Sequence, residues 1–527
     1  MTRPTPLFRP RRAAFARASA ALLALSLAGA GLVGCSGSID VRSSSDDSTA
    51  SGPAAQAGAA DRFYGQSVEW GDCEEGDPAE AQCGEIEVPL NWEDPEGETI
   101  TVALARVQTA DPEARLGSLL FNPGGPGISG IQGLTAQLTQ TPEPVLAAYD
   151  LVAFDPRGVG RSTPVDCLDD PELDAYLAEF SPDDEAGEAA PAEFGAAEFG
   201  AACAERTGEL LGFVDTASAA RDLDAIRAVL GDEALNYLGY SYGTLLGAAY
   251  AELFPERVGR LVLDGAADPS KNARDRFPEQ MAAFDRSLTA FATACAATED
   301  CPLGDNADQI LAAVVEFLQN ALEQPLPLPD GRELTQEMAL TGIMFGLYSE
   351  DRWELLGAAL YNAYAGDGVM LSMAYDFYND RDTETGRFAT NQSEAGQAIN
   401  CLDQPRGDDD PAVIAAQDQA LVEAAPIFGQ FTSTAPSCAN WPEPRRLTPH
   451  AVAAPGAAPV LVVGTTGDPA TPYEQAVALA EQLESGVLLT YEGEQHTAYG
   501  TANSQCVDDA VNAFLIDGTM PPEGTRC

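Results

Sequence analysis

Short apolar runs that alternate with amphipathic runs are the dominant pattern of this chain. The amphipathic stretch 216–230 places Ala220, Leu223, Ile226 and Leu230 at helical spacing. Alternating strands and helices predict an α/β fold with a mostly parallel, doubly wound sheet. The buried strands are expected at 118–121, 151–154, 235–238, 258–265, 459–464 and 487–491, and antiparallel edge strands at 86–90 and 100–107.

The pattern changes in the middle of the chain, where helix-like runs replace strands. We therefore predict an α/β core at 61–270 and 441–527, interrupted by a mainly helical cap at 271–440. Aromatic and methionine side chains of this region are expected to pack in the cap interior. They are Met344, Phe345, Tyr348, Trp353 and Tyr361; the expected helices are 277–297, 307–322, 335–347, 353–365 and 411–425.

The N-terminus has the features of an export signal. Five arginines precede an apolar stretch, 18–33, that is shorter than a typical transmembrane helix. It ends in Leu-Val-Gly-Cys35, which resembles a bacterial lipobox and implies a signal peptide at 1–34 with diacylglycerol on Cys35. An ordinary secreted protein is the alternative. The Ser/Gly/Ala/Asp-rich segment 35–60 is predicted to be a flexible tether, so the protein is expected outside the cell, anchored to the membrane through Cys35.

Charge and cysteine content narrow the classes of partner and cofactor. The 28 basic and 82 acidic residues give a formal net charge of −54, which argues against nucleic acid as a partner. Ten cysteines remain besides Cys35, and an even number in an exported chain predicts five disulfides. Sequential pairing is our prediction, although spacing does not fix connectivity: Cys73–Cys83, Cys167–Cys203, Cys295–Cys301, Cys401–Cys438 and Cys506–Cys527. Two histidines and no C-x-x-C pair argue against zinc; no metal or cofactor is expected, and the chain is expected to be a monomer.

A candidate nucleophile lies where one apolar strand meets a helix. The segment Gly239-Tyr-Ser-Tyr-Gly243 has the G-x-S-x-G form of a nucleophile turn, which raises the Ser241 hydroxyl above a sheet. A serine needs a base and an orienting carboxylate. His496 follows the last strand and Asp468 the strand before it, where active-site residues of open α/β sheets gather. His450 lies in a Pro/Ala-rich connection and is disfavoured as the base.

Other residues are candidates for the acid position, for an oxyanion hole and for supporting a loop. Asp403 and Asp264 compete with Asp468 for the acid position, although neither follows a late strand in the Ser-Asp-His order. The glycine-rich loop 122–127 follows a strand, so the N–H of Gly125 or a neighbouring glycine is expected to join that of Tyr242 in an oxyanion hole. Asp155 and Arg157 are expected to brace their loop by ion pairing.

Five motifs together resemble the actinobacterial tripeptidyl-aminopeptidase-like serine peptidases, relatives of the proline iminopeptidases. The likeness covers about 61–527 and implies an α/β-hydrolase fold with a helical cap, export, and exopeptidase activity on free peptide or protein N-termini. It also implies the roles of Ser241 as nucleophile, His496 as base and Asp468 as its partner. The motifs are Asn122-Pro-Gly-Gly-Pro-Gly127, Asp155-Pro-Arg-Gly-Val-Gly-Arg-Ser162, Gly239-Tyr-Ser-Tyr-Gly243, Gly467-Asp-Pro-Ala-Thr-Pro472 and Gln495-His-Thr-Ala-Tyr499.

An aminopeptidase must also bind the substrate α-amine, and Asp403 is the candidate, with a solvated surface carboxylate as the alternative interpretation. Two other functions compete. A carboxylesterase or lipase would use the same three residues, and a solute-binding lipoprotein would keep the fold without the chemistry.

Overall fold

A computed structural model describes residues 53–178, 195–407 and 410–527, and residues 51–527 form one compact unit. The predicted signal peptide, Cys35 and most of the predicted tether lie outside the described residues. Within the described ranges, no helix combines the length and the apolar character that a membrane crossing requires.

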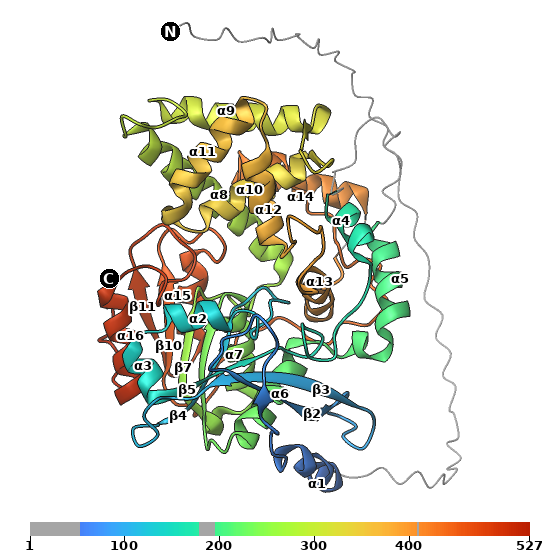
Figure 1. The fold of residues 1–527 in the computed structure, drawn as a ribbon, viewed down its shortest axis with the longest axis vertical. Helices are drawn as coiled ribbons and strands as arrows, with labels where there is room; N and C mark the ends of the chain where they lie inside the picture. Colours follow the sequence, from blue (N-terminus) through green and yellow to red (C-terminus); the bar gives the residue numbers. More distant parts are fainter. Residues whose placement is uncertain (1–52, 179–194, 408–409) are drawn as a thin grey trace, which may run out of the picture. The chain divides into compact units, whose positions relative to one another are not determined.

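A nine-stranded sheet forms the centre of the fold, in the order β1-β2-β3-β5-β4-β6-β7-β10-β11 (Figure 1). Pairing is antiparallel from β1 to β5 and parallel from β5 to β11, which confirms the predicted doubly wound α/β fold. The strands are β1 Gly71–Asp72, β2 Gln82–Pro89, β3 Thr99–Val107, β4 Gly117–Asn122, β5 Tyr149–Phe154, β6 Leu235–Tyr240, β7 Val258–Asp264, β10 Val460–Thr465 and β11 Gly486–Tyr491.

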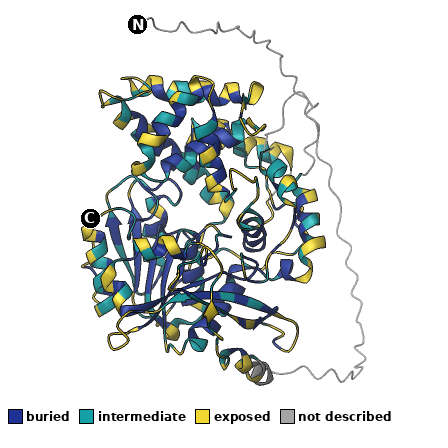
Figure 2. Ribbon diagram, viewed as in Figure 1, coloured by how far each residue is buried: buried dark blue, intermediate teal, exposed yellow. Residues whose placement is uncertain are grey.

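Both faces of the parallel strands are covered by helices, which explains why these strands are apolar throughout. In β4, Leu119 and Phe121 point into one apolar cluster and Leu120 into the other. Figure 2 shows these strands as buried and the outer helix surfaces as exposed. One face packs against α6 Thr216–Val229, α7 Tyr242–Leu253 and α15 Tyr473–Gln482, the other against α2 Leu134–Gln140, α3 Glu143–Ala148 and α16 Gln505–Asp517.

A third apolar cluster, separate from the two on the faces of the sheet, holds the helical cap together. The five helices expected there are present within a few residues of the predicted bounds. Two more, α12 and α13, were not predicted: α13 mixes its apolar residues with glycine and polar residues, whereas α12 is short and apolar on most sides. The α-helices of this region are α8 Ala273–Ala296, α9 Ala307–Glu323, α10 Gln336–Leu347, α11 Trp353–Tyr364, α12 Val369–Tyr378, α13 Gln392–Asp403 and α14 Pro411–Ala424. Two short strands, β8 Leu326–Pro327 and β9 Glu333–Leu334, pair with each other between α9 and α10.

The buried apolar side chains of helix α13 pack against the sheet and not into the cap cluster. Its buried residues Ala398, Ile399 and Leu402 belong to the apolar cluster of the sheet. Conversely, α4 (Asp170–Ala178), which precedes the cap in the chain, contacts the cap cluster through Leu177. The segment 271–440 is therefore not packed as one body: α13 is part of the core layer that surrounds the active site.

All five disulfides predicted by sequential pairing are present. One of them, Cys401–Cys438, ties the end of α13 to the segment that follows α14. Five disulfides are typical of proteins that fold in an oxidising compartment outside the cytosol.

Candidate active site

Ser241 occupies the tight turn between β6 and α7. Its φ of 54° is in the left-handed region, which is strained for a serine and typical of a nucleophile turn. The turn needs glycine on both sides: a Cβ on Gly239 would lie 2.4 Å from the Gly243 carbonyl oxygen, and one on Gly243 would lie 2.8 Å from the Asn122 carbonyl oxygen. The Ser241 N–H donates to the Asp264 carbonyl at 2.9 Å, which fixes the turn to the end of β7.

His496 and Asp468 form a hydrogen-bonded pair beyond the ends of β11 and β10. The Nδ1 atom of His496 lies 2.8 Å and 3.0 Å from the two carboxylate oxygens of Asp468. Because Nδ1 is engaged there, Nε2 is the nitrogen left to act as a base. Thr471 donates from its backbone N–H and hydroxyl to Asp468, at 2.8 Å and 3.0 Å, and its Oγ1 lies 3.3 Å from His496 Nδ1.

The cap and the end of β7 hold the imidazole in place. The backbone N–H of His496 donates to the backbone carbonyl of Tyr348 at 2.8 Å. The side-chain rings of the two residues meet edge to face, with centroids 5.4 Å apart. On the other side lies Gly265, where a Cβ would be only 3.0 Å from the His496 ring. Gly265 follows Asp264, whose carbonyl binds the Ser241 N–H, so one short segment positions both residues. In the part of the chain that the structure describes, no direct hydrogen bond joins the Ser241 hydroxyl to His496; such bonds are often long before substrate binds.

Other acids and the second histidine have different places. Asp264 is fully buried, and its carboxylate accepts from the N–H groups of Ala498 and Tyr499, which braces the loop that carries His496. His450 is exposed at the surface, 2.9 Å from Glu252. Of the two histidines and three aspartates considered from the sequence, the structure thus pairs His496 with Asp468.

Electrostatics favours the protonated form of the imidazole. Burial by itself would lower the pKa of His496, but the Asp468 carboxylate and, more weakly, Asp264 outweigh burial, so the pKa lies above its ordinary value. Burial also raises the pKa of Asp264 to about 6, against the two backbone hydrogen bonds that lower it.

Two backbone N–H groups beside the serine turn are candidates for the oxyanion hole. A Cβ on Gly124 would lie 2.9 Å from the Ser241 Cβ, so the glycine loop and the serine turn touch. The Gly124 N–H is engaged, because it donates to the Asn122 side chain at 3.0 Å. Among the described residues the N–H of Gly125 has no acceptor, and the N–H of Tyr242, the first residue of α7, has no acceptor within its helix. The predicted pair Gly125 and Tyr242 is thus available for an oxyanion.

The position of Asp403 corrects both predictions made for it. It is neither a surface carboxylate nor a ligand for a substrate amine, because it is buried at the end of α13 and accepts from the N–H and hydroxyl of Thr216, at 3.0 Å and 2.5 Å. Burial raises the pKa of Asp403 to about 7, and nearby Asp215 adds to the effect.

Asp155 and Arg157 both brace their loop, Arg157 by the predicted ion pairing and Asp155 by hydrogen bonds instead. Arg157 is fully buried and pairs with Asp222 on α6, Nε to Oδ2 at 2.6 Å. Asp155 accepts from the Ser129 hydroxyl and from the N–H groups of Ile131 and Arg161. It therefore ties the exit of β5 to the segment that follows the glycine loop.

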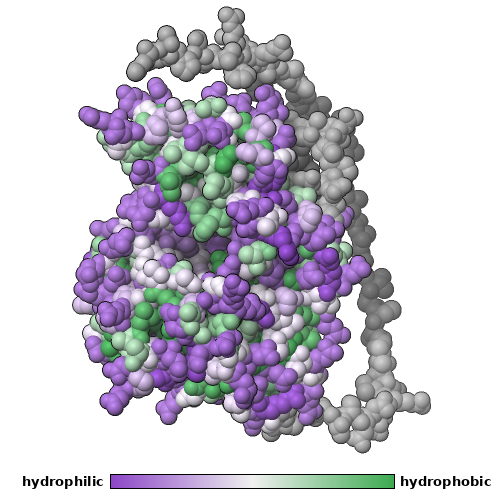
Figure 3. Space-filling view, in the orientation of Figure 1, coloured by the Kyte–Doolittle hydropathy of each residue, from purple (hydrophilic) through white to green (hydrophobic). Residues whose placement is uncertain are grey.

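A partly exposed stripe on α10 begins at the catalytic pair. Glu337, Thr341, Met344 and Tyr348 lie at helical spacing and are all partly exposed, whereas the other face of α10 is buried. Of the side chains expected in the cap interior, Met344, Tyr348 and Trp353 pack against the cap cluster but are only half-buried, and Tyr361 is exposed. Figure 3 shows apolar side chains gathered over the lower end of the cap, beside a hollow.

Aromatic side chains of α12 extend this stripe. Tyr378 stands between Tyr348 and Phe345, with ring centroids 6.3 Å and 6.4 Å away, and Phe345 contacts Phe377 at 5.3 Å. Phe377 is 71% exposed, so one side of its ring is open to solvent or to a ligand. We call Phe345, Tyr348, Phe377 and Tyr378 the aromatic wall.

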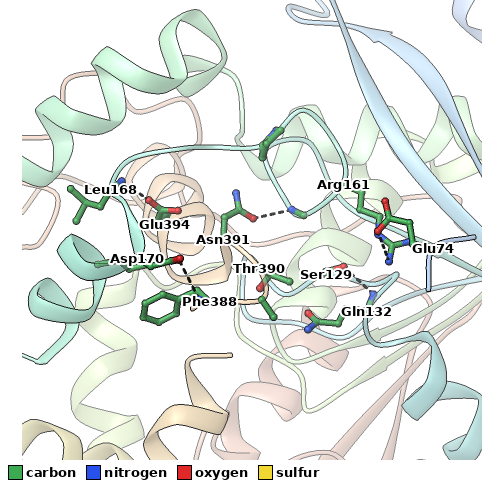
Figure 4. A pocket seen from close by; sticks show the side chains of 14 residues that line it. Glu74, Ser129, Gln132, Arg161, Leu168, Asp170, Phe388, Thr390, Asn391 and Glu394 are labelled. Carbon is green, nitrogen blue, oxygen red and sulfur yellow. Dashed lines mark hydrogen bonds and ion pairs between the residues drawn. The ribbon is translucent and has the colours of Figure 1, made fainter. Parts of the chain in front are cut away.

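A cavity of about 460 Å³ lies beside the glycine loop (Figure 4). Ser129 and Gln132 line it from the segment after the loop, and Asn391 and Glu394 from the start of α13. Glu394 accepts from the N–H groups of Cys167 and Leu168, so its carboxylate is engaged in holding the cavity wall. The lining does not include the serine or the His–Asp pair, and sequence patterns gave no sign of it because its residues come from four separate segments.

Sequence comparisons agree with this site. Residues 425–527 match the model of a family described as TAP-like protein. Serine protease Hip1 of Mycobacterium tuberculosis is 40% identical over 481 residues, covering 88% of this chain and 91% of that protein. Carboxylesterase B of the same species is 38% identical (87% and 89% covered), and tripeptidyl aminopeptidase of Streptomyces lividans is 32% identical (89% and 88% covered).

The sheet topology and the serine at its tight turn define an α/β-hydrolase, and the protein is a serine hydrolase. More particularly, the identity over most of the chain shows that it belongs to the TAP-like family of serine peptidases.

Proposed function

We propose that this protein is an exported serine peptidase that releases short peptides from free N-termini, with Ser241, His496 and Asp468 as its catalytic residues. The observation that carries the proposal is the convergence of a strained serine turn with a buried His–Asp pair, both anchored on the end of β7. The names of the relatives support peptidase chemistry, and one of them indicates release of tripeptides.

The chemistry follows from the arrangement. Ser241 Oγ attacks the scissile carbonyl carbon, and its proton passes to Nε2 of His496. Asp468 holds the imidazole in the required tautomer and stabilises the imidazolium that forms. The carbonyl oxygen becomes an oxyanion and accepts from the N–H groups of Gly125 and Tyr242, each contributing about 10²–10³ in rate. His496 then protonates the leaving amine, an acyl-enzyme remains, and water attacks it by the same route in reverse to release the peptide.

Glu337 is our candidate for the group that binds the substrate α-amine. Its carboxylate accepts from the Thr341 hydroxyl, 3.3 Å away, and among the described residues it forms no ion pair. The twelve residues from Glu337 to Tyr348 span about 16 Å along the helix axis, and an extended peptide of three to four residues spans about 10–14 Å. A peptide along the aromatic wall, with its carbonyl at Ser241, would therefore bring its amine near Glu337. Burial raises the pKa of Glu337 to about 7, and a cationic amine beside it would favour the ionised carboxylate.

A comparison of tripeptide anilides tests the reaction. A free α-amine and its N-acetylated counterpart should differ in kcat/KM by at least about tenfold in favour of the free amine, since one desolvated ion pair is at stake. Ser241→Ala is the control and should lose cleavage of both. Equal cleavage of the two substrates would overturn the aminopeptidase assignment and favour an endopeptidase or the carboxylesterase alternative, which the name of one relative supports.

We also propose attachment to the outer face of the cell membrane through Cys35. The five disulfides support an exported protein, and the sequence around Cys35 supports lipidation. The wild-type protein should incorporate a labelled fatty acid and Cys35→Ser should not, without a change in specific activity. Equal labelling of the two proteins would contradict lipid anchoring.

A further inference from the structure

Helix α13 begins against the glycine loop. A Cβ on Gly127 would lie 2.2 Å from the Gln392 carbonyl oxygen and 2.6 Å from the Gly396 nitrogen, and one on Gly396 would lie 2.7 Å from the Pro126 carbonyl oxygen. The helix and the loop therefore touch backbone to backbone, and glycine on both sides is what allows this. Two residues before Gly127 stands Gly125, the first of the two oxyanion donors.

The C-terminal end of the same helix is linked to Tyr242, the residue of the second oxyanion donor. Asp403, its last residue, accepts from the N–H and hydroxyl of Thr216, and Thr216 Oγ1 lies 2.6 Å from the Tyr242 hydroxyl. All three side chains are buried. Tyr242 is the first residue of α7, so a restraint on its side chain is also a restraint on the direction of its N–H.

We propose that α13 is a brace that sets the separation of the two oxyanion donors, and that Asp403 and Thr216 are positioning residues that act through Tyr242. The helix is a rigid element twelve residues long, about 18 Å. Its first turns contact the loop that carries Gly125, and its last residue is linked through Thr216 to the hydroxyl of Tyr242. The Cys401–Cys438 disulfide fixes its far end, next to Asp403. The proposal deepens the proposed function, because it rests on the Gly125 and Tyr242 donors assigned there.

Oxyanion stabilisation depends steeply on donor geometry, since the donors must meet the oxygen of the transition state rather than that of the substrate. Loss of a whole donor costs about 10²–10³ in rate. Loosening a donor without removing it should cost less, about tenfold. Affinity for the ground state should hardly change.

A double-mutant cycle on Thr216→Val and Tyr242→Phe tests the link, because each variant removes one hydroxyl and keeps the shape and the backbone N–H. Hydrolysis of p-nitrophenyl acetate and inhibition by phenylboronic acid, which forms a tetrahedral adduct on serine, are the readouts. Neither readout depends on aminopeptidase activity. The proposal for α13 can therefore be tested even if the protein does not cleave peptides from free N-termini. Each single variant should lower kcat/KM about tenfold and raise the phenylboronic acid Ki by the same factor. The double variant should have the same kcat/KM and Ki as the single variants, since each substitution removes the hydrogen bond between Thr216 and Tyr242.

Matched controls separate this role from general stability. Thr109→Val and Tyr149→Phe remove buried hydroxyls that bond to the carbonyls of Ala147 and Leu515, away from the site, and should lower Tm without changing kcat/KM or Ki. Asp403→Asn, which keeps one acceptor for the Thr216 N–H, should retain more activity than Asp403→Ala. Unchanged Ki in the Thr216 and Tyr242 variants, or effects that multiply in the double variant, would overturn the proposal.

Discussion

The ionisation of His496 sets the pH range in which the site works. The imidazole must be neutral to take the Ser241 proton, and its pKa is raised above the ordinary value of 6.5, chiefly because the Asp468 charge outweighs burial. We therefore expect kcat/KM to fall as the pH is lowered through this raised pKa, with the acid limb of the profile above pH 6.5. The same shift stabilises the folded state below about pH 6.5, and this contribution is lost as the pH rises through the folded-state pKa.

A pH series of kcat/KM with a neutral ester, together with a pH series of Tm, checks both signs. Asp468→Asn should shift the acid limb to lower pH and reduce kcat/KM by about 10⁴, because the imidazole loses its charge partner and tautomer. An acid limb at the same pH in the variant would assign the titration to another group.

Glu337 makes a separate prediction at the residue scale. If its carboxylate binds the substrate amine, Glu337→Gln should lower kcat/KM for a free tripeptide anilide by about tenfold and leave the N-acetylated anilide unchanged. Glu354→Gln, an exposed glutamate on α11, is the matched control. Equal losses on both substrates would place Glu337 in the cap structure rather than in amine binding.

Residue-scale prediction from sequence worked where chemistry restricts the choice. Only two histidines compete for the role of base, and the order Ser241, Asp468, His496 leaves one plausible set. Asp403 and Glu337 show the limit, because the chain has 82 acidic residues and no pattern distinguishes a buried one from a solvated one. Asp403 is buried only because α13 folds against the sheet, which is a property of long-range packing.

At the scale of the element, α13 is one of two cap helices that sequence periodicity missed, and it is the one that lies against the active site. Its glycine, at position 396, has a low helix propensity and lowers the apparent periodicity, yet that glycine is needed for contact with the glycine loop. The strands and the five regular cap helices were predictable because buried apolar runs and 3.6-residue spacing are local signals. A helix whose role is close packing against a loop carries no such signal.

This conflict between propensity and packing gives a sharp prediction. Gly396→Ala improves helix propensity by about 1 kcal/mol, but its Cβ would lie 2.7 Å from the Pro126 carbonyl oxygen and displace the loop. We expect kcat/KM for esters to fall at least about tenfold, because the Gly125 donor moves with the loop. Gly357→Ala on α11 is the control, since its Cβ would meet nothing closer than 3.7 Å and should leave kcat/KM unchanged. Full activity of Gly396→Ala would show that the loop tolerates the shift.

At the scale of the whole molecule, the sheet carries the catalytic residues and the cap contributes side chains around them. The carboxyl ends of the parallel strands carry the serine, the acid and the base, as expected for an open α/β sheet. The cap contributes Tyr348, which binds the His496 N–H, together with the aromatic wall. The cap sequence predicted helices but not the substrate, because specificity depends on which faces of those helices remain uncovered.

The net charge of −54 acts on the same cleft from a distance. Hydrophilic side chains cover most of the face drawn in Figure 3, and the excess of acidic residues makes the surrounding potential negative. A free peptide N-terminus is cationic, so the field should raise its local concentration at low salt. The screening length is about 30 Å at 0.01 M and about 8 Å at 0.15 M ionic strength, so only the shorter-range part survives in the second condition.

We therefore expect kcat/KM for a lysine-containing tripeptide anilide to fall several-fold between these two salt concentrations. A substrate with neutral side chains should change less, and one with two glutamates should improve with salt. The three peptides share a backbone, so their differences report side-chain charge rather than general salt effects on the enzyme. Identical salt dependence for all three would mean that the negative field does not reach the cleft, and that amine recognition depends on short-range contacts alone.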